Sequence, residues 1–146
     1  MSKRIAILGS TGSIGKNALR VIDALGSDYE VVALTAHNSV ELLAEQVKRY
    51  KPSFAAITNP GAAASFADLV SGTSVKVLSG AESMVALACL DEVDIVLTAV
   101  VGAAGLLAGV YWGRGGGGER GELRGGRAHL KKKNKYGRSV SAAYVL

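Results

Sequence analysis

Short, almost uninterrupted apolar runs recur along residues 1–112 and alternate with stretches in which apolar residues follow a helical spacing. The runs are rich in valine, isoleucine, leucine and alanine and are too short for helices, which predicts buried strands. They occupy residues 4–8, 30–36, 54–57, 75–80 and 93–102. The stretches between them carry an apolar residue every three or four positions, which predicts amphipathic helices. These stretches are 14–25, 37–52, 59–72 and 81–90.

This order of elements indicates the fold class. Because the strands lack an alternation of apolar and polar residues, both faces of their sheet must be covered. Strands that alternate with helices favour an α/β fold, a doubly wound, Rossmann-like parallel sheet with helices on both faces. We expect residues 1–112 to form this domain. We expect its sheet to be incomplete, since the alternation stops near residue 112.

Residues 113–146 have a different composition. They hold nine of the chain's 19 glycines, together with nine of its 17 Lys and Arg and only two Glu. This segment therefore carries a net charge of +7, and residues 1–112 carry −2, which together give the +5 of the chain. Few apolar residues are spaced for a core, so burial cannot offset the entropy of ordering. We expect a Gly/Arg/Lys-rich, disordered tail.

Composition also limits the compartment and the partners. No apolar run approaches the ~20 residues that a membrane-spanning helix needs, so no membrane partner is expected. The chain starts directly with a predicted strand, without a leader, and has a single cysteine, which favours the cytoplasm. This residue, Cys89, lies on an apolar helical stretch without a basic neighbour, so we expect a core position rather than a nucleophile.

The stretch "GSTGSIG" at residues 9–15 joins the first predicted strand to the first predicted helix. A helix N-terminus offers unpaired N–H groups and the positive end of the helix dipole, which together attract phosphate. Gly12 would let the backbone approach a pyrophosphate, while Thr11 and Ser13 can donate hydrogen bonds. The spacing is G-x-x-G-x-x-G and no G-K-[ST] follows, which disfavours a P-loop. The alternative is a glycine turn without a ligand.

The end of the second predicted strand bears on the choice of cofactor. Enzymes that bind NAD usually carry an Asp or Glu there, which accepts hydrogen bonds from the ribose hydroxyls. This chain has Ala36, His37, Asn38 and Ser39 instead, without a carboxylate. A 2′-phosphate would meet polar donors and no negative charge, which favours NADPH over NADH. The alternative is that these side chains cap the following helix.

Three stretches carry a resemblance to a known family. "KRIAILGSTGSIGKNAL", "VVALTAHNSVELLAEQVKRYKP" and "VDIVLTAVVGAAGLL" resemble the N-terminal domain of 1-deoxy-D-xylulose 5-phosphate reductoisomerase, over about residues 3–110. The resemblance implies an NADPH-dependent oxidoreductase that requires Mg²⁺ or Mn²⁺. Its substrate would be a sugar phosphate, 1-deoxy-D-xylulose 5-phosphate, which it rearranges and reduces to 2-C-methyl-D-erythritol 4-phosphate in non-mevalonate isoprenoid biosynthesis. It also implies a homodimer.

The resemblance assigns cofactor-binding residues by position. They are Thr11, Gly12, Ser13 and Ile14 in the glycine loop, and His37, Asn38 and Ser39 after the second strand. The second group departs from the family pattern, since His37 stands where glycine is usual and Ser39 where asparagine is usual.

The sequence departs further from the family pattern after Gly102. About twenty residues after Gly102 the family places an "ANKES"-like strand end that serves cofactor and substrate, whereas residues 122–126 are Glu-Leu-Arg-Gly-Gly. The family's acidic metal ligands and catalytic domain would lie beyond residue 146. We therefore assign no catalytic and no metal-binding residue. We expect a truncated cofactor-binding fragment that is inactive alone.

Two other functions and the origin of the tail remain open from the sequence. The Arg-Gly-Gly triplets at 114–116 and 124–126 resemble an RNA-binding segment, which would make the chain a non-enzymatic nucleotide-binding module. The tail can instead result from a reductoisomerase gene that is translated out of frame from about codon 109. We favour this origin, because a tail that evolved to bind RNA would not be expected to begin where a helix is half complete. The second function is that of another NADP-linked dehydrogenase that shares the glycine loop.

Overall fold

The computed structural model describes residues 2–100, 123–124, 127–133 and 139–145. The helices are α1 (Ser13–Leu25), α2 (Val40–Tyr50), α3 (Ala63–Leu69) and α4 (Glu82–Ala88), with the short 3-10 helices η1 (Gly26–Asp28) and η2 (Pro60–Ala62). The strands are β1 (Lys3–Leu8), β2 (Tyr29–Ala36), β3 (Phe54–Ile57), β4 (Lys76–Ser79), β5 (Ile95–Thr98), β6 (Leu123–Arg124), β7 (Arg127–Lys133) and β8 (Ser139–Val145). Up to residue 100, the predicted strands and helices are confirmed in type and order.

The helix predicted over 59–72 differs in detail, because it begins as η2 before α3 starts. The side chain of Asn59 accepts a hydrogen bond from the Gly61 backbone N–H at 3.0 Å, and Pro60 fixes the next backbone angle. Asparagine in this position stabilises a tight local turn, which explains the 3-10 start.

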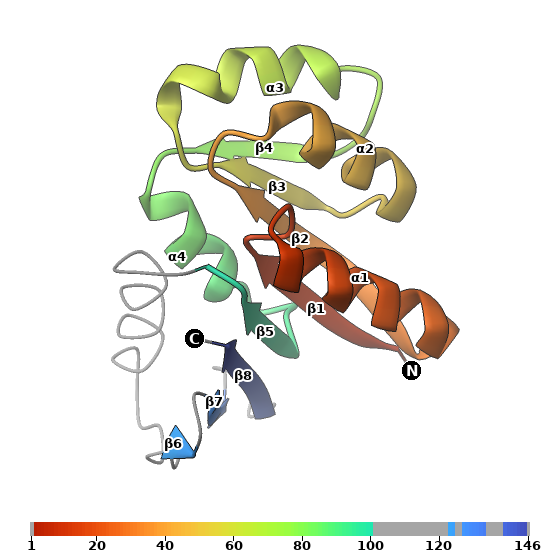
Figure 1. Ribbon diagram of the computed structural model, residues 1–146, viewed down its shortest axis with the longest axis vertical. Helices are drawn as coiled ribbons and strands as arrows, with labels where there is room; N and C mark the ends of the chain where they lie inside the picture. Colours follow the sequence, from red (N-terminus) through yellow and green to blue (C-terminus); the bar gives the residue numbers. More distant parts are fainter. Residues whose placement is uncertain (1, 101–122, 125–126, 134–138, 146) are drawn as a thin grey trace.

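All strands belong to one sheet in the order β4-β3-β2-β1-β5-β8-β7-β6. The pairs from β4 to β5 are parallel, which confirms the predicted doubly wound, Rossmann-like fold. The chain places β2, β3 and β4 on one side of β1 and then returns to place β5 on the other side (Figure 1). This reversal puts the topological switch point at the carboxyl ends of β1 and β5, where α/β domains of this type bind ligands.

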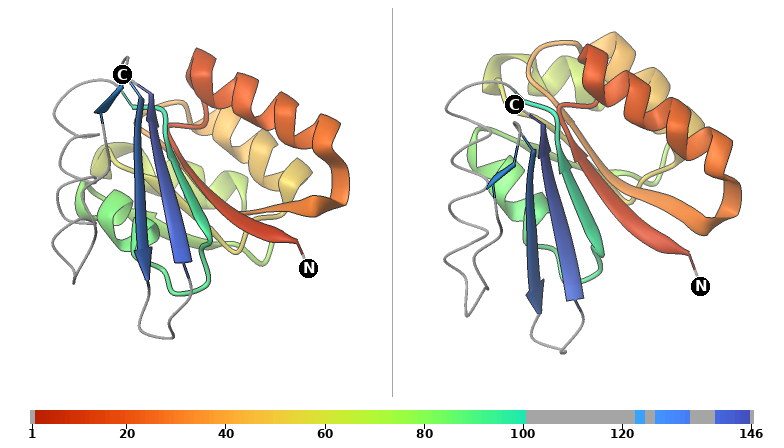
Figure 2. Two further views of the ribbon diagram at one scale, coloured as in Figure 1. Left: turned by 90° about the horizontal axis from the view of Figure 1, so that it is seen from below. Right: turned by 60° about the horizontal axis from the view of Figure 1, so that its bottom comes forward.

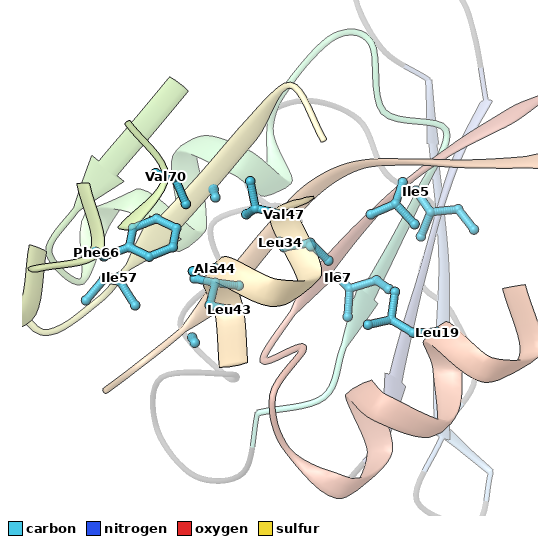
Figure 3. Close-up of a cluster of buried hydrophobic side chains, with 13 residues drawn as sticks. Ile5, Ile7, Leu19, Leu34, Leu43, Ala44, Val47, Ile57, Phe66 and Val70 are labelled. Atoms are coloured by element: carbon cyan, nitrogen blue, oxygen red, sulfur yellow. The ribbon is translucent and has the colours of Figure 1, made fainter. Parts of the chain in front are cut away.

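Helices cover the two faces of the sheet unequally. On one face, α1, α2 and α3 bury Leu19, Leu43, Val47 and Phe66 against strand residues such as Ile7 and Leu34 (Figure 3). On the other face, α4 buries Met84 and Leu87 against Ala6, Leu8 and Val96. Figure 2 shows α4 across the sheet from α1. The predicted two-sided burial of the strands follows from this arrangement.

The last three strands lie where the sequence predicts a disordered tail. Strand β8 pairs in parallel with β5, from Ile95 opposite Ser141 to Thr98 opposite Tyr144. Strand β7 pairs with β8 in antiparallel fashion along its whole length. Within the segment 113–146, for which disorder is expected, the structure thus describes strands β6, β7 and β8, while residues 113–122, 125–126, 134–138 and 146 lie outside the described part, and the expectation for them stays a prediction. Strand β8 covers the open edge of β5 through backbone pairing. Such a long-range pairing cannot be recognised from the spacing of apolar residues along the sequence.

Cys89 directly follows α4 and is exposed, so the expectation of a core position is wrong. The apolar spacing of "AESMVALACL" is real, but it buries Met84, Leu87 and Ala88 on one side of the helix. Cys89 lies one residue beyond this buried stripe.

Two observations concern partners. The described residues include no helix with the length and apolar character needed to cross a membrane. The Arg-Gly-Gly triplets that suggest an RNA-binding tail lie, apart from Arg124, outside the described residues.

Candidate functional site

A cleft of about 1060 Å³ opens at the carboxyl ends of β1, β2, β3 and β5, on the side of the sheet that carries α4. Its lining comes from the glycine loop, the ends of these strands and the first turns of α4. The lining residues are Gly9, Thr11, Gly12, Thr35, Ala36, His37, Thr58, Ala81, Glu82, Met84, Val85, Ala86, Ala99 and Val100. The cleft therefore lies at the switch point of the sheet.

The glycine loop leaves β1 through a backbone conformation that favours glycine. Gly9 has a φ of +85°, and a Cβ there would lie 2.8 Å from a methyl group of Val100. The backbone N–H groups of Gly9 and Ser10 both donate to the Thr35 carbonyl oxygen, at 3.2 and 2.9 Å. The Gly9 N–H also lies 3.0 Å from the Thr35 hydroxyl oxygen. The loop is thus fixed to the end of β2.

The N-terminus of α1 follows this loop and lacks a side-chain cap. Its N-cap residue is Gly12, with φ −74° and ψ 172°, and the first turn contains no acidic residue. The unpaired N–H groups and the positive end of the helix dipole are therefore free of a competing carboxylate in this turn. A Cβ on Gly12 would meet only the Gly9 carbonyl oxygen, at 3.8 Å, so the space beside Gly12 is open.

The segment after β2 is held by side chains that follow β3. The His37 Nδ1 atom and the Thr58 hydroxyl are hydrogen bonded at 2.8 Å. The Asn59 amide donates to Asn38 Oδ1 at 2.6 Å. The N-cap residue of α2, Ser39, makes no side-chain capping bond. Asn38 and Ser39 therefore do not act as side-chain caps of α2, and the alternative capping interpretation is not supported by these contacts.

A buried polar cluster links the glycine loop to α2. The Ser10 hydroxyl donates to Gln46 Oε1 at 2.6 Å, and Gln46 Nε2 donates to the Ser10 carbonyl oxygen at 3.0 Å. Ser10 is fully buried and Gln46 is 7% exposed. Sequence reasoning missed Gln46, although it falls on the same helical face as Leu43 and Val47. A polar residue within that apolar stripe was the available signal.

The structure brings some of the predicted site residues together. Thr11, Gly12 and His37 line the cleft, whereas the following residues Ser13 and Ile14, and Asn38 and Ser39, are not among its lining residues. Sequence reasoning missed Thr35, Thr58 and the wall formed by α4. Thr35 is a fully buried polar residue within the otherwise apolar, buried run from Val31 to Ala36, a signal comparable to that of Gln46.

Among the residues that the structure describes, no three His, Cys, Asp or Glu side chains lie together as a metal ion would require. The described residues therefore do not fit a magnesium or manganese site.

The parallel sheet, together with a glycine loop that opens on a cleft at the switch point, defines the chain as a Rossmann-like domain. The model of the family "1-deoxy-D-xylulose 5-phosphate reductoisomerase" matches residues 5–112. The chain belongs to this family.

Individual relatives agree with the family match. The 1-deoxy-D-xylulose 5-phosphate reductoisomerase of Halothermothrix orenii is 40% identical over 106 residues, which cover 73% of this chain and 28% of the relative. The solved reductoisomerase of Zymomonas mobilis in complex with NADPH has a TM-score of 0.73 at 33% identity and covers 77% of this chain and 29% of that one. A DOX-P reductoisomerase in complex with NADPH, fosmidomycin and magnesium has a TM-score of 0.72 at 33% identity, over 75% and 27% of the two chains. The chain thus spans less than a third of the length of these relatives.

Proposed function

We propose that the cleft binds NADPH and that residues 1–112 are the cofactor-binding domain of a 1-deoxy-D-xylulose 5-phosphate reductoisomerase. The observation that carries this proposal is the uncapped N-terminus of α1, which the glycine loop brings to the cleft. A dinucleotide pyrophosphate matches this combination of unpaired N–H groups and open backbone. The family match and the NADPH-bound relative support the proposal.

The two groups of site residues would hold different parts of the cofactor. Thr11, Gly12, Ser13 and Ile14 would surround the pyrophosphate, because they form the loop and the first turn of α1. His37, Asn38 and Ser39 would lie at the 2′-phosphate, since they follow β2 and include no carboxylate. A phosphate there would meet a histidine ring, an amide and a hydroxyl rather than a like charge.

NADPH supplies a hydride for the family's reaction, and the residues of this chain would bind and orient it. The reduced substrate would be 1-deoxy-D-xylulose 5-phosphate, as the names of the relatives state for those proteins. The described residues include no group of side chains that fits the magnesium of the relatives. The roles that we propose for this chain are therefore limited to binding and orienting NADPH. We further propose a cytoplasmic location, where NADPH is available, and a homodimer.

The test is a calorimetric titration of the full chain with NADPH and NADH. We expect NADPH to bind about tenfold more tightly, since the 2′-phosphate adds charge-assisted hydrogen bonds. Ser13→Ala should weaken the binding of both cofactors, whereas the control Ser71→Ala, at an exposed serine that follows α3 outside the cleft, should leave both unchanged. Equal affinities for the two cofactors, or a preference for NADH, would contradict the proposal.

A further inference from the structure

Gln46 and Ser10 form a reciprocal pair of hydrogen bonds that joins two separate elements. Gln46 lies in the second turn of α2, and Ser10 lies in the glycine loop that ends at the cleft. The Ser10 hydroxyl lies 2.6 Å from Gln46 Oε1 and 3.3 Å from the Thr35 carbonyl oxygen, and its single proton serves the shorter contact. The Gln46 amide in turn donates to the loop backbone, at the Ser10 carbonyl oxygen.

The environment of Gln46 makes these contacts necessary. The neighbouring positions on the same helical face, Leu43 and Val47, belong to the hydrophobic core. A buried amide costs free energy unless its donor and acceptor are both paired, and here each has a partner on Ser10. An apolar side chain would satisfy the core equally well, but it could not bind the loop.

The pair completes the attachment of the loop on both sides. On the side of β2, the Gly9 and Ser10 backbone N–H groups are held by Thr35. On the side of α2, the Ser10 carbonyl oxygen is held by Gln46. The carbonyl oxygen and the N–H of one loop residue are therefore both fixed, immediately before Thr11 and Gly12 enter the cleft.

We propose that Gln46 is a positioning residue that holds the glycine loop in its nucleotide-binding conformation. This inference rests on the proposed NADPH site, to which Gln46 itself contributes no lining atom. A loop that is ordered before binding does not lose that conformational freedom when the nucleotide arrives, which strengthens binding. Gln46 thereby also connects the loop to the helix that follows His37, Asn38 and Ser39.

The first experiment compares Gln46→Met with Val47→Ala in the full chain. Methionine keeps the unbranched shape of glutamine but makes neither hydrogen bond, whereas Val47→Ala destabilises the same helix by leaving a cavity. NADP⁺ affinity is measured by calorimetry well below the melting temperature of each variant. We expect Gln46→Met to bind about tenfold more weakly and Val47→Ala to bind like the wild type.

Amide hydrogen exchange provides a readout that needs no nucleotide. In Gln46→Met the Gly9 and Ser10 amides should exchange faster than in the wild type, because their loop is held on one side only. In Val47→Ala they should not change relative to their neighbours in β1. If Gln46 only stabilised the fold, the exchange of the Gly9 and Ser10 amides would not differ between the two variants in this way.

A third variant, Gln46→Glu, makes the contact depend on pH. The ionised carboxylate can accept from the Ser10 hydroxyl but cannot donate to the Ser10 carbonyl oxygen, whereas the protonated acid can do both. The NADP⁺ affinity of this variant, divided by that of the wild type at the same pH, should therefore rise as the pH falls from 8 towards 5. Because the nucleotide phosphates ionise in the same way with both proteins, their effect on affinity cancels in this ratio.

The outcomes separate this inference from the proposed function. If the wild type binds NADP⁺ and Gln46→Met binds equally well with unchanged loop exchange, the positioning role is overturned and the nucleotide site stands. A flat affinity ratio for Gln46→Glu across the pH range would likewise overturn it. If the wild type binds no NADP⁺, the proposed function fails, and the positioning role for a nucleotide fails with it.

Discussion

Gly15 of α1 packs directly against the carbonyl oxygen of Gly9, so that a Cβ at position 15 would clash with that oxygen and lie 2.6 Å from the Cα of Ser10. The three atoms nearest to such a Cβ all belong to the backbone of Gly9 and Ser10, and they cannot turn aside as a flexible side chain can. The absence of a side chain at position 15 therefore allows the start of α1 to pack directly against the loop.

Gly15→Ala should destabilise the protein. Alanine gains about 1 kcal/mol over glycine in a helix interior, but overpacking against fixed atoms costs about 1–3 kcal/mol or more, and this backbone clash belongs at the upper end. We expect a net loss of about 2 kcal/mol in the free energy of unfolding, measured by urea denaturation. Gly72→Ala is the control, since a Cβ there meets nothing within 4 Å. Equal stability of the two variants would contradict the close packing.

The sequence predicted those features that depend on local pattern. The glycine loop was expected to join the first strand to the first helix, and the structure confirms this position between β1 and α1. The parallel sheet followed from apolar runs such as that of β2, which is buried from Val31 to Ala36.

Features that depend on long-range contacts were missed. Gln46 is separated from Ser10 by 36 residues, and no local pattern shows that a polar residue on an apolar helix face has a partner so far along the chain. Strand β8 contains small residues and two serines, and it becomes a strand through pairing with β5 more than forty positions earlier. Periodicity identifies elements, but it does not identify partners.

The stability of the protein should fall in alkali through Tyr50. Burial raises the pKa of Tyr50 above its usual value of 10.0, and the hydrogen bond to Asp23 and the charge of Asp23 raise it further, while Arg49 lowers it. The unfolded tyrosine ionises first, so the stabilisation is complete below about pH 9 and is lost as the pH rises through 10 and above. Urea denaturation of the wild type and Tyr50→Phe should show a shallower alkaline decline for the variant. Parallel declines would contradict the raised pKa.

Gly12→Val should remove nucleotide binding without unfolding the protein. The extended backbone at position 12 suits a β-branched residue, and a Cβ there meets only one atom, at 3.8 Å. The added methyl groups would occupy the open space through which the pyrophosphate approaches the backbone. Calorimetry should show at least tenfold weaker binding of both NADPH and NADH, with a melting temperature close to that of the wild type. If binding is retained, the pyrophosphate does not lie beside Gly12.

Asn38→Asp should reduce the preference for NADPH. The aspartate keeps the oxygen that accepts from Asn59 at 2.6 Å, so the local structure is preserved while one negative charge is added. Two like charges 4 Å apart repel by about 1–4 kcal/mol near a protein surface, so NADPH affinity should fall about tenfold while NADH affinity changes little. Asn17→Asp adds the same charge on α1, outside the residues that line the cleft, and should leave the ratio of affinities unchanged. An unchanged ratio in Asn38→Asp would place the 2′-phosphate elsewhere.

The full chain should bind NADPH without consuming it when 1-deoxy-D-xylulose 5-phosphate and Mn²⁺ are present. Correct placement of the nicotinamide against its substrate can account for about 7–11 kcal/mol of a barrier, and a metal ion must polarise the substrate oxygens. The described residues offer a cleft for the cofactor but no three metal-binding side chains together. The segment at 122–126 is Glu-Leu-Arg-Gly-Gly, without the asparagine, lysine and glutamate of the "ANKES"-like stretch. NADPH oxidation is followed by absorbance beside a full-length relative as the positive control. Turnover within about a hundredfold of that relative, a barrier difference below about 3 kcal/mol, would show that this chain carries catalytic groups that its glycine loop and cleft do not reveal.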